Sequence, residues 1–231
     1  MIPFSWIYVT GIVFLWMLFG GYGIAVGYHR YFSHKSFETY PIIAKCLSIL
    51  GLMAMAGSTL FWVSYHRGTH HRYADKPQDL HSPKRGLLRS FILWQNDIDH
   101  TSVNPMSGRD VLRDKFLVWQ HKHQNKIFWG IILATAIVSW HVALGVLIPA
   151  IVVSHHQDNF INVLGHLRAT GYRNFETDDD SVNDYLTGWL FWGQGWHNNH
   201  HYNPSVVDYG SIKWWEFDSA AKILIPIIRK R

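Results

Sequence analysis

Long apolar stretches alternate with histidine-rich polar segments along this chain of 231 residues. Residues 6–28 carry no charged side chain, and residues 127–153 form a second uncharged stretch. Each is long enough to cross a bilayer core, which takes about 20 apolar residues. The second stretch continues toward His166 and is too long for one crossing, so we expect a helical hairpin that turns near Trp140. The pattern predicts membrane-spanning helices at about 6–28, 127–140 and 143–165.

Eight histidines stand between these stretches in three short clusters. They are His29 and His34, then His66, His70 and His71, and then His197, His200 and His201. Helical residues at i, i+3 and i+4 share a face, so His66 with His70, and His197 with the two that follow it, can aim several imidazoles at one point. The step from His29 to His34 does not share a face. There we expect the helix to end or unwind around Phe32 and Ser33.

The number and type of these side chains predict a metal centre with two ions. Neutral imidazole suits zinc, copper, iron and nickel, so ligand type leaves the metal open. Eight histidines exceed what one ion can bind. A single cysteine, Cys46, argues against a structural zinc site, and the Glu-x-x-His pairs of soluble di-iron bundles are absent. A histidine-rich dinuclear centre beside a membrane suits dioxygen activation against an unreactive aliphatic substrate.

Composition and charge support a membrane protein and set its orientation. The chain is 48% hydrophobic, with 12 Trp and only 16% charged residues, which is unusual for a soluble protein. All 21 Lys and Arg lie between Arg30 and Lys126 or from Arg168 onward. By the positive-inside rule, about 29–126 and 166–231 are cytoplasmic, and the N-terminus and hairpin tip lie outside.

The apolar run 40–63 needs a separate interpretation. Only Lys45 interrupts it, and hydropathy alone would make it another crossing. A single crossing would place His29 and His66 on opposite faces of the membrane, where they could not share a metal site. We therefore expect 40–63 to return to the side it left, as an in-plane or buried helix.

Four ordered motifs resemble the integral-membrane fatty acyl desaturases, typified by stearoyl-CoA desaturase. Gly27–Phe37 (GYHRYFSHKSF) is similar to the first histidine box of that family, His66–Asp75 (HRGTHHRYAD) to the second and Gly195–Pro204 (GWHNNHHYNP) to the third. Asn162–His166 (NVLGH) matches its Asn-x-x-x-His element. The resemblance runs from about Gly20 to Asp218.

The resemblance implies a fold, a reaction and a ligand set. The fold would be all-α, a single domain over 1–231, with multi-pass membrane helices capped by a cytosolic helical domain that holds a di-iron centre. Two iron ions, O2 and electrons from a separate donor such as cytochrome b5 or ferredoxin would introduce a cis double bond into an acyl-CoA or acyl-lipid substrate. No nucleic-acid partner is implied. The implied iron ligands are His29, His34, His66, His70, His71, His166, His197, His200 and His201, with Asn162 acting through an iron-bound water.

Some residues fall outside that pattern or depart from it. Asp75 or Asp184 could orient ligand imidazoles. Gln194 stands where the family often has Glu, the second box is one residue longer than in the animal acyl-CoA enzymes, and one helix precedes the first box where the family usually has two. We expect surface or interfacial positions for the other histidines, His81, His100, His121, His123, His141, His155 and His156.

Two other functions stay open at this stage. Membrane hydroxylases of lipids or alkanes use similar histidine boxes. A non-catalytic membrane metal-binding or transport protein is a different class, but transport calls for polar residues inside the crossings, and these spans hold almost none. A multi-pass protein with a cytoplasmic active site is expected, and the compact chain favours a bacterial inner membrane over the endoplasmic reticulum.

Overall fold

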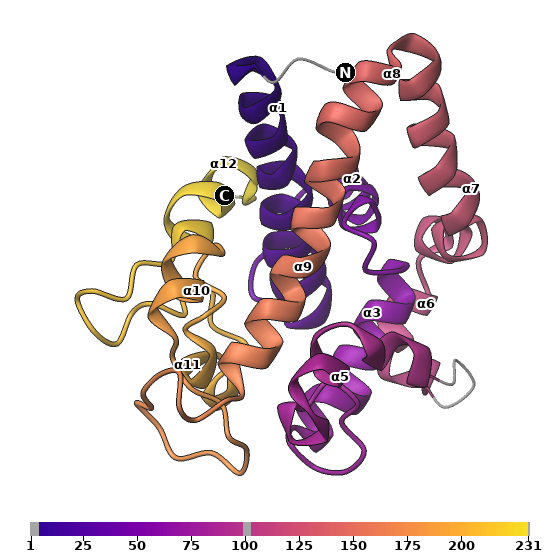
Figure 1. Cartoon of the computed structure of the whole chain (residues 1–231). Coiled ribbons are helices and arrows are strands. Elements are labelled where there is room, and N and C mark those ends of the chain that lie inside the picture. The colour runs from indigo at the N-terminus through magenta and orange to yellow at the C-terminus, as the bar shows by residue number, and fades with distance from the viewer. Residues whose placement is uncertain (1–4, 99–102, 231) are drawn as a thin grey trace.

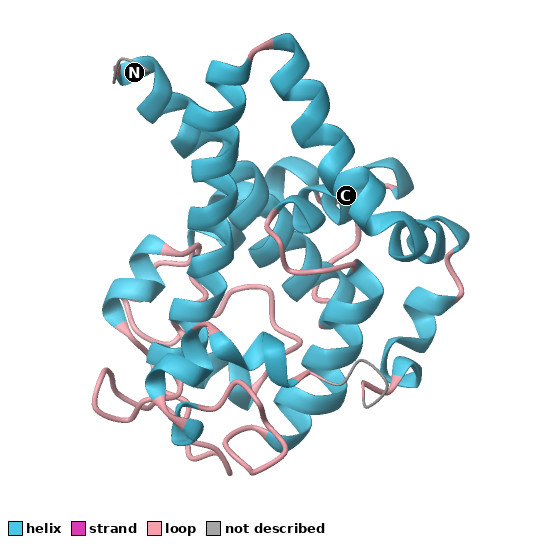
Figure 2. Ribbon diagram, turned by 45° about the vertical axis from the view of Figure 1, so that its right-hand side comes forward, coloured by secondary structure: helices cyan, strands magenta, loops and turns pink. Residues whose placement is uncertain are grey.

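The computed structural model describes residues 5–98 and 103–230, and over these residues it is all-α, as the sequence predicts, with no strand (Figures 1 and 2). Segments labelled η are π- or 3-10-helical. The first half contains α1 (Trp6–Trp16), η1 (Met17–Ser33), α2 (Pro41–Met53), α3 (Thr59–Tyr65), η2 (His66–His70), α4 (His71–Tyr73), η3 (Pro83–Arg85), α5 (Leu87–Phe91), η4 (Leu93–Asp97), η5 (Pro105–Gly108) and α6 (Arg109–Leu112). The second half contains α7 (Lys115–Val138), α8 (Trp140–Val142), η6 (Ala143–Leu147), α9 (Ile148–Gly165), α10 (Tyr185–Leu190), α11 (His197–Tyr202), η7 (Ala220–Leu224) and α12 (Ile225–Ile228).

The first helix combines α1 and η1 into one continuous element, Trp6–Ser33. Among the helices in the described part of the chain, it is the one whose length and mean hydropathy clearly suit a membrane crossing, so the crossings expected at 127–140 and 143–165 stay predictions. Its first turns expose Trp6 and Ile7, which are 81% and 82% accessible. Its second half is buried and carries the first histidine pair into the interior.

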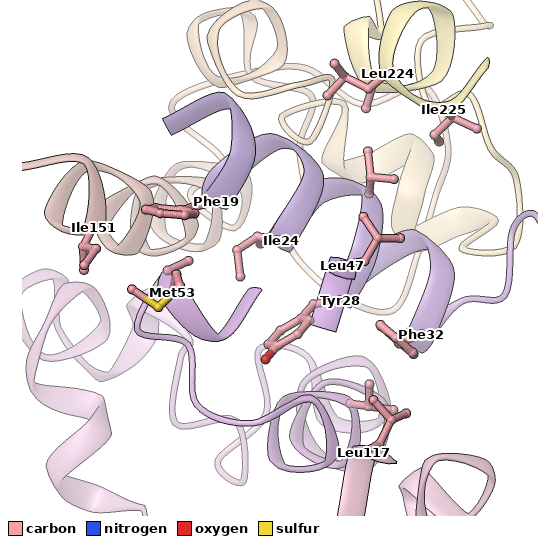
Figure 3. Packing of buried hydrophobic residues seen from close by; sticks show 14 of the residues in the cluster. Phe19, Ile24, Tyr28, Phe32, Leu47, Met53, Leu117, Ile151, Leu224 and Ile225 are labelled. Carbon is pink, nitrogen blue, oxygen red and sulfur yellow. The ribbon is translucent and has the colours of Figure 1, made fainter. Parts of the chain in front are cut away.

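The hydrophobic core forms where η1 packs against α2 (Figure 3). Ile24 and Tyr28 of η1 are fully buried there, beside Leu47 of α2. The two helices approach closely because Gly23 has no side chain. A Cβ atom at Gly23 would lie 2.5 Å from the backbone nitrogen of Gly51. Small residues at such a position let two helix backbones pack closely.

The run 40–63 forms two helices instead of one. α2 ends at Met53, and α3 begins at Thr59 after Ser58, whose side chain accepts a hydrogen bond from the backbone N–H of Phe61. Between them Met55 and Gly57 have positive φ values of 57° and 77°, which breaks the helix. After this break, α3 leads directly into η2, which carries His66 and His70.

The hairpin predicted after residue 126 lies at α7 and α9. α7 ends at Val138 and the chain turns at Ser139, whose side chain caps α8. In Figures 1 and 2 this turn lies at the same end of the molecule as the start of α1. Ile137 and Val138 are 77% and 88% exposed there. The histidine-bearing helices η2 and α11 lie toward the other end of the molecule (Figure 1).

Candidate metal centre

Nine histidines form two adjacent groups, each with its ring nitrogens within 4.8 Å of one another. They are the nine that the sequence resemblance identifies. The first group holds His29, His34, His66, His71 and His200; the second holds His70, His166, His197 and His201. Six of the nine are buried, and His34, His71 and His201 are partly buried. The three boxes and α9 thus converge on one interior site.

Two π-helical turns bring together histidines that are five positions apart in the sequence. In η1 the backbone N–H of His34 donates to the carbonyl oxygen of His29, 3.1 Å away, a five-residue bond that places the two rings 4.9 Å apart. In η2 the same spacing separates His66 and His71, whose Nε2 atoms lie 3.0 Å apart. The helix ends at Ser33, as predicted, but it is this wider turn that pairs His29 with His34. π-turns are rare and concentrate at functional sites.

The second and third boxes are each divided between the two groups, contrary to the expectation that His66 with His70, and His197 with His200 and His201, aim at one point. His66 and His70 belong to different groups although they are four residues apart. On α11, His197 and His201 share the second group, whereas His200 belongs to the first. The reason is that His70–His71 and His200–His201 are adjacent pairs, and successive residues of an α-helix point about 100° apart.

The nitrogens in the second group converge in a way that fits a metal ion. The Nδ1 atoms of His166 and His201 lie 2.8 Å from carboxylate oxygens, and Nδ1 of His197 lies 3.3 Å from the carbonyl oxygen of Gln194. These acceptors place the ring proton on Nδ1 and leave a lone pair on Nε2. The His166 and His197 Nε2 atoms are nevertheless 3.0 Å apart. Facing lone pairs repel each other unless a cation lies between them.

The distances in the first group fit a metal ion in the same way. Nε2 atoms lie 3.0 Å apart in His29 and His200, 2.9 Å in His34 and His66, and 3.0 Å in His71 and His200. Imidazole nitrogens bound to an ion at about 2.0–2.1 Å and at right angles to one another would be about 3.0 Å apart. The nine donors therefore fit two ions, although they do not select iron among the metals that imidazole binds.

Electrostatics keeps most of these rings neutral and ready to bind a cation. Burial and the neighbouring imidazoles hold the pKa of His66, His71 and His200 well below its usual range. The same causes lower the pKa of His34 to about 3. His70 differs, because the nearby carboxylate charges outweigh burial and raise its pKa.

Three aspartates contact the second group. Asp75 Oδ2 lies 2.8 Å from Nδ1 of His166, which confirms the predicted orienting contact. Asp179 Oδ2 lies 2.8 Å from Nδ1 of His201. Asp79 Oδ2 is 3.3 Å from Nδ1 of His70, in ion-pair range but misaligned for a hydrogen bond. The prediction for Asp184 is wrong, because this side chain caps α10 through the backbone N–H of Thr187.

The two asparagines of the third box hold α11 in place. Oδ1 of Asn198 accepts hydrogen bonds from the backbone N–H groups of Asn174 and Phe175, at 2.8 and 2.9 Å. Asn199 donates through Nδ2 to the carbonyl oxygen of Tyr209 and to Oε2 of Glu216, at 2.8 and 3.0 Å. These buried bonds fix the helix that supplies histidines to both groups.

A cavity of about 420 Å³ opens beside the histidines. His29 and His66 of the first group and His70 and His197 of the second line it, together with apolar side chains that include Ile24, Phe61, Trp62 and Trp94. The volume lies in the usual range for ligand pockets, about 300–1,000 Å³. A ligand bound in this cavity would therefore contact both groups.

Asn162 and His81 also line this cavity. Asn162 is buried, and its Nδ2 donates to the carbonyl oxygen of His81 at 2.6 Å; it is not among the nine converging donors. His81 is only 7% exposed and packs against Trp94, so the expected surface position is wrong. His121, His123, His141, His155 and His156 are partly exposed, whereas His100 lies outside the described residues.

Sequence comparison identifies the family. Residues 4–231 match the family model described as fatty acid desaturase. The chain is 33% identical over 222 residues to the sn-2 palmitoyl-lipid 9-desaturase of Nostoc sp. (strain 36), a match that covers 93% of this chain and 76% of that protein. It is 32% identical over 209 residues to delta-9 acyl-lipid desaturase 1 of Arabidopsis thaliana (86% of this chain, 65% of that protein). It is 32% identical over 220 residues to the sn-1 stearoyl-lipid 9-desaturase of Anabaena variabilis (93% and 78%). This chain therefore belongs to the fatty acid desaturase family.

Proposed function

We propose that this protein is an O2-dependent fatty acyl desaturase that introduces a cis double bond into a saturated chain at a di-iron centre. The observation that carries the proposal is the cavity, whose wall includes histidines of both groups and apolar side chains. Family membership supports the reaction class.

Each of the two histidine groups would hold one iron ion. His29, His34, His66, His71 and His200 would bind one, and His70, His166, His197 and His201 the other. Asn162 lies on the cavity next to the second group and would act through a bound water. The bound metal would supply the oxidant that removes hydrogen from an unactivated methylene, which side-chain acids and bases cannot do.

The protein's own residues would position the chain and exclude water. Trp62 stacks on His66 with ring centroids 4.4 Å apart, so a chain lying against this indole passes next to the first group. Ile24 and Phe61 continue the apolar wall. Holding two adjacent methylenes against both groups would direct the oxidation to one bond of the chain.

Acyl lipid is the substrate that the comparisons favour. The three relatives described above are named as acyl-lipid or lipid 9-desaturases, which supports a lipid-bound chain and a double bond at carbon 9. Electrons would come from a separate donor such as cytochrome b5 or ferredoxin.

Exposed apolar side chains support a membrane arrangement with several crossings. The family is membrane-associated, and Trp6–Ser33 is long and apolar enough to cross. We infer two further crossings at about 127–140 and 143–165. Their support is the exposure of apolar side chains near the hairpin turn, such as Trp129 at 63% and Leu133 at 61%. The basic segments 29–126 and 166–231 would then be cytoplasmic, with 40–63 folded back on that side.

The test is fatty-acid methyl ester analysis of cells that express the chain together with a redox partner. We expect a new monounsaturated acid, with its double bond located by mass spectrometry. It should disappear in His71→Ala, which removes a nitrogen from the first group. The matched control is His123→Ala, since His123 lies outside both groups, stacked on Trp119, and should leave the product unchanged.

Two outcomes would contradict the proposal. A hydroxylated acid that depends on His71 would assign the sibling hydroxylase reaction. A purified protein that binds no divalent metal would exclude a metal centre altogether, and with it both reactions.

A further inference from the structure

The carboxylates around the metal centre are distributed unevenly between the two histidine groups. His166 and His201 of the second group each have an aspartate oxygen 2.8 Å from Nδ1, and His70 has one at 3.3 Å. Within the described residues, no carboxylate lies within 4.0 Å of an imidazole nitrogen of the first group. The neutral amide of Gln194 occupies the cavity wall beside His29 instead.

These aspartates are held as anions by their own surroundings. Asp75 also accepts hydrogen bonds from the hydroxyl of Ser82 and the backbone N–H of Asp180, at 2.7 and 2.8 Å. Asp179 accepts from the hydroxyl of Thr177 and the backbone N–H of Ser181, at 2.7 and 3.0 Å. These donors, together with the contacts to His166 and His201, stabilise the ionised form of both carboxyls.

An anionic partner on Nδ1 changes what the imidazole offers at Nε2. It fixes the tautomer and the ring orientation, and it makes Nε2 a stronger donor to a metal. The carboxylates of Asp75, Asp79 and Asp179 also place three negative charges next to the rings that would bind a cation in the second group. The first group has one more imidazole but lacks these charges, so the two positions differ in affinity for reasons beyond ligand number.

We propose that the two metal positions are unequal, and that Asp75 and Asp179 are positioning residues that make the second group the tighter and first-filled site. This inference rests on the proposed metal centre but not on the reaction. It predicts stepwise loading, in which the first equivalent of metal binds to His70, His166, His197 and His201. The second equivalent then completes the centre at the first group.

The experiment is a Co²⁺ titration of the whole chain in detergent after chelator treatment. Bound metal would be measured by equilibrium dialysis with elemental analysis, and the site type by the visible Co²⁺ spectrum. We expect two binding steps. His29→Ala should abolish the weaker step and leave the tighter one. Asp179→Asn should weaken the tighter step by on the order of 10-fold to 100-fold, the usual cost of removing such a partner.

Asp180 offers a matched control on the same turn. Its side chain pairs with Lys84 and Arg168, each at 2.6 Å, and contacts no imidazole, whereas its bond to Asp75 is made by the backbone N–H, which the substitution keeps. Asp180→Asn should therefore leave both steps unchanged. Asp75→Asn is a second variant for the tighter step; Asp75 has a φ of 61°, a conformation that asparagine tolerates well.

Several results would overturn the inference. Two equivalents that bind wild type with one affinity would show equal positions. An Asp179→Asn variant that binds metal like Asp180→Asn would show that Asp179 does not strengthen the second group. An Asp179→Asn variant that loses the step that His29→Ala also removes would show that Asp179 acts on the first group instead. A wild-type protein that binds no Co²⁺ would instead reject the metal centre, and hence the proposed function.

Discussion

The buried ion pair between Arg30 and Asp218 holds the C-terminal segment against the first histidine box. Both side chains are 0% exposed, and Nη2 of Arg30 lies 2.7 Å from Oδ2 of Asp218. Asp218 also accepts from the backbone N–H groups of Tyr209 and Ala221, at 2.9 and 3.0 Å. Arg30 follows His29 directly, and the Tyr209 ring stacks on its guanidinium at 4.1 Å. The ion pair therefore fixes the backbone next to His29, a member of the first group.

Asp218→Ala would leave a buried guanidinium without its partner. Breaking a buried pair on one side costs about 3–5 kcal/mol, and each orphaned backbone N–H adds about 1–3 kcal/mol unless water reaches it. The total is a large part of a typical folding free energy of about 5–15 kcal/mol. Replacing both partners, as Arg30→Met with Asp218→Ala, removes the unpaired charge and should recover part of the loss.

The assay is denaturant or thermal unfolding of the purified chain in one detergent. Asp208→Ala is the matched control, because Asp208 pairs with Lys222 at 2.8 Å and both side chains are partly exposed. A surface pair of this kind contributes about 0–1 kcal/mol. If Asp218→Ala destabilised the protein no more than Asp208→Ala, or if the double variant were less stable than the single one, the reasoning would be refuted.

Three further predictions concern packing, pH and the second box. Gly23→Ala should lower the free energy of unfolding by about 1–3 kcal/mol through overpacking, because the new Cβ would lie 2.5 Å from the Leu50 backbone. A Cβ at Gly130 meets nothing within 4 Å, so Gly130→Ala should be neutral or stabilising in the same unfolding assay. Burial and positive neighbours lower the pKa of His34 to about 3, and most of the other imidazoles outside the membrane-spanning helix shift the same way. The unfolded chain thus binds more protons below about pH 6.5, and the metal-free protein should lose stability as pH falls from there toward 4; a Tm that rises on acidification would contradict this. Deleting Thr69 should convert the π-turn of η2 to an α-turn and retain metal binding, measured by elemental analysis; complete loss of both metals would show that the turn is not adjustable.

The helical fold follows largely from hydropathy, but its breaks do not. Apolar residues run almost without interruption through 40–63, and averaging over such a run hides the positive φ values of Met55 and Gly57. Local signals were present in Gly57 followed by Ser58, a stop residue before a helix cap. The crossings that we propose after residue 126 are less distinct in hydropathy, because α7 begins with polar turns and α9 carries histidines in its middle.

The sequence predicts which histidines come together but not how they divide into two groups. Nine histidines could be named because motifs fix their identity, whereas their assignment to two groups depends on helix type and on contacts between distant segments. Asp75 and His166 are 91 positions apart. Asp179 has only a faint signal, as part of the acidic turn 178–180, and nothing local distinguishes it from Asp180, which pairs with surface cations.

The π-turn in η2 accounts for the length of the second box. An α-helix aligns residues four apart, so a box of the form His-x-x-His-His pairs its first and last histidines on one face. This chain has one residue more, and an α-helix would pair His66 with His70. The π-turn absorbs the extra residue and aligns His66 with His71 instead, with Nε2 atoms 3.0 Å apart. The adjacent His70 then points to the second group. Both box lengths can therefore direct the first and last rings to one histidine group and the remaining ring to the other group, because a change in helix type compensates for a change in spacing.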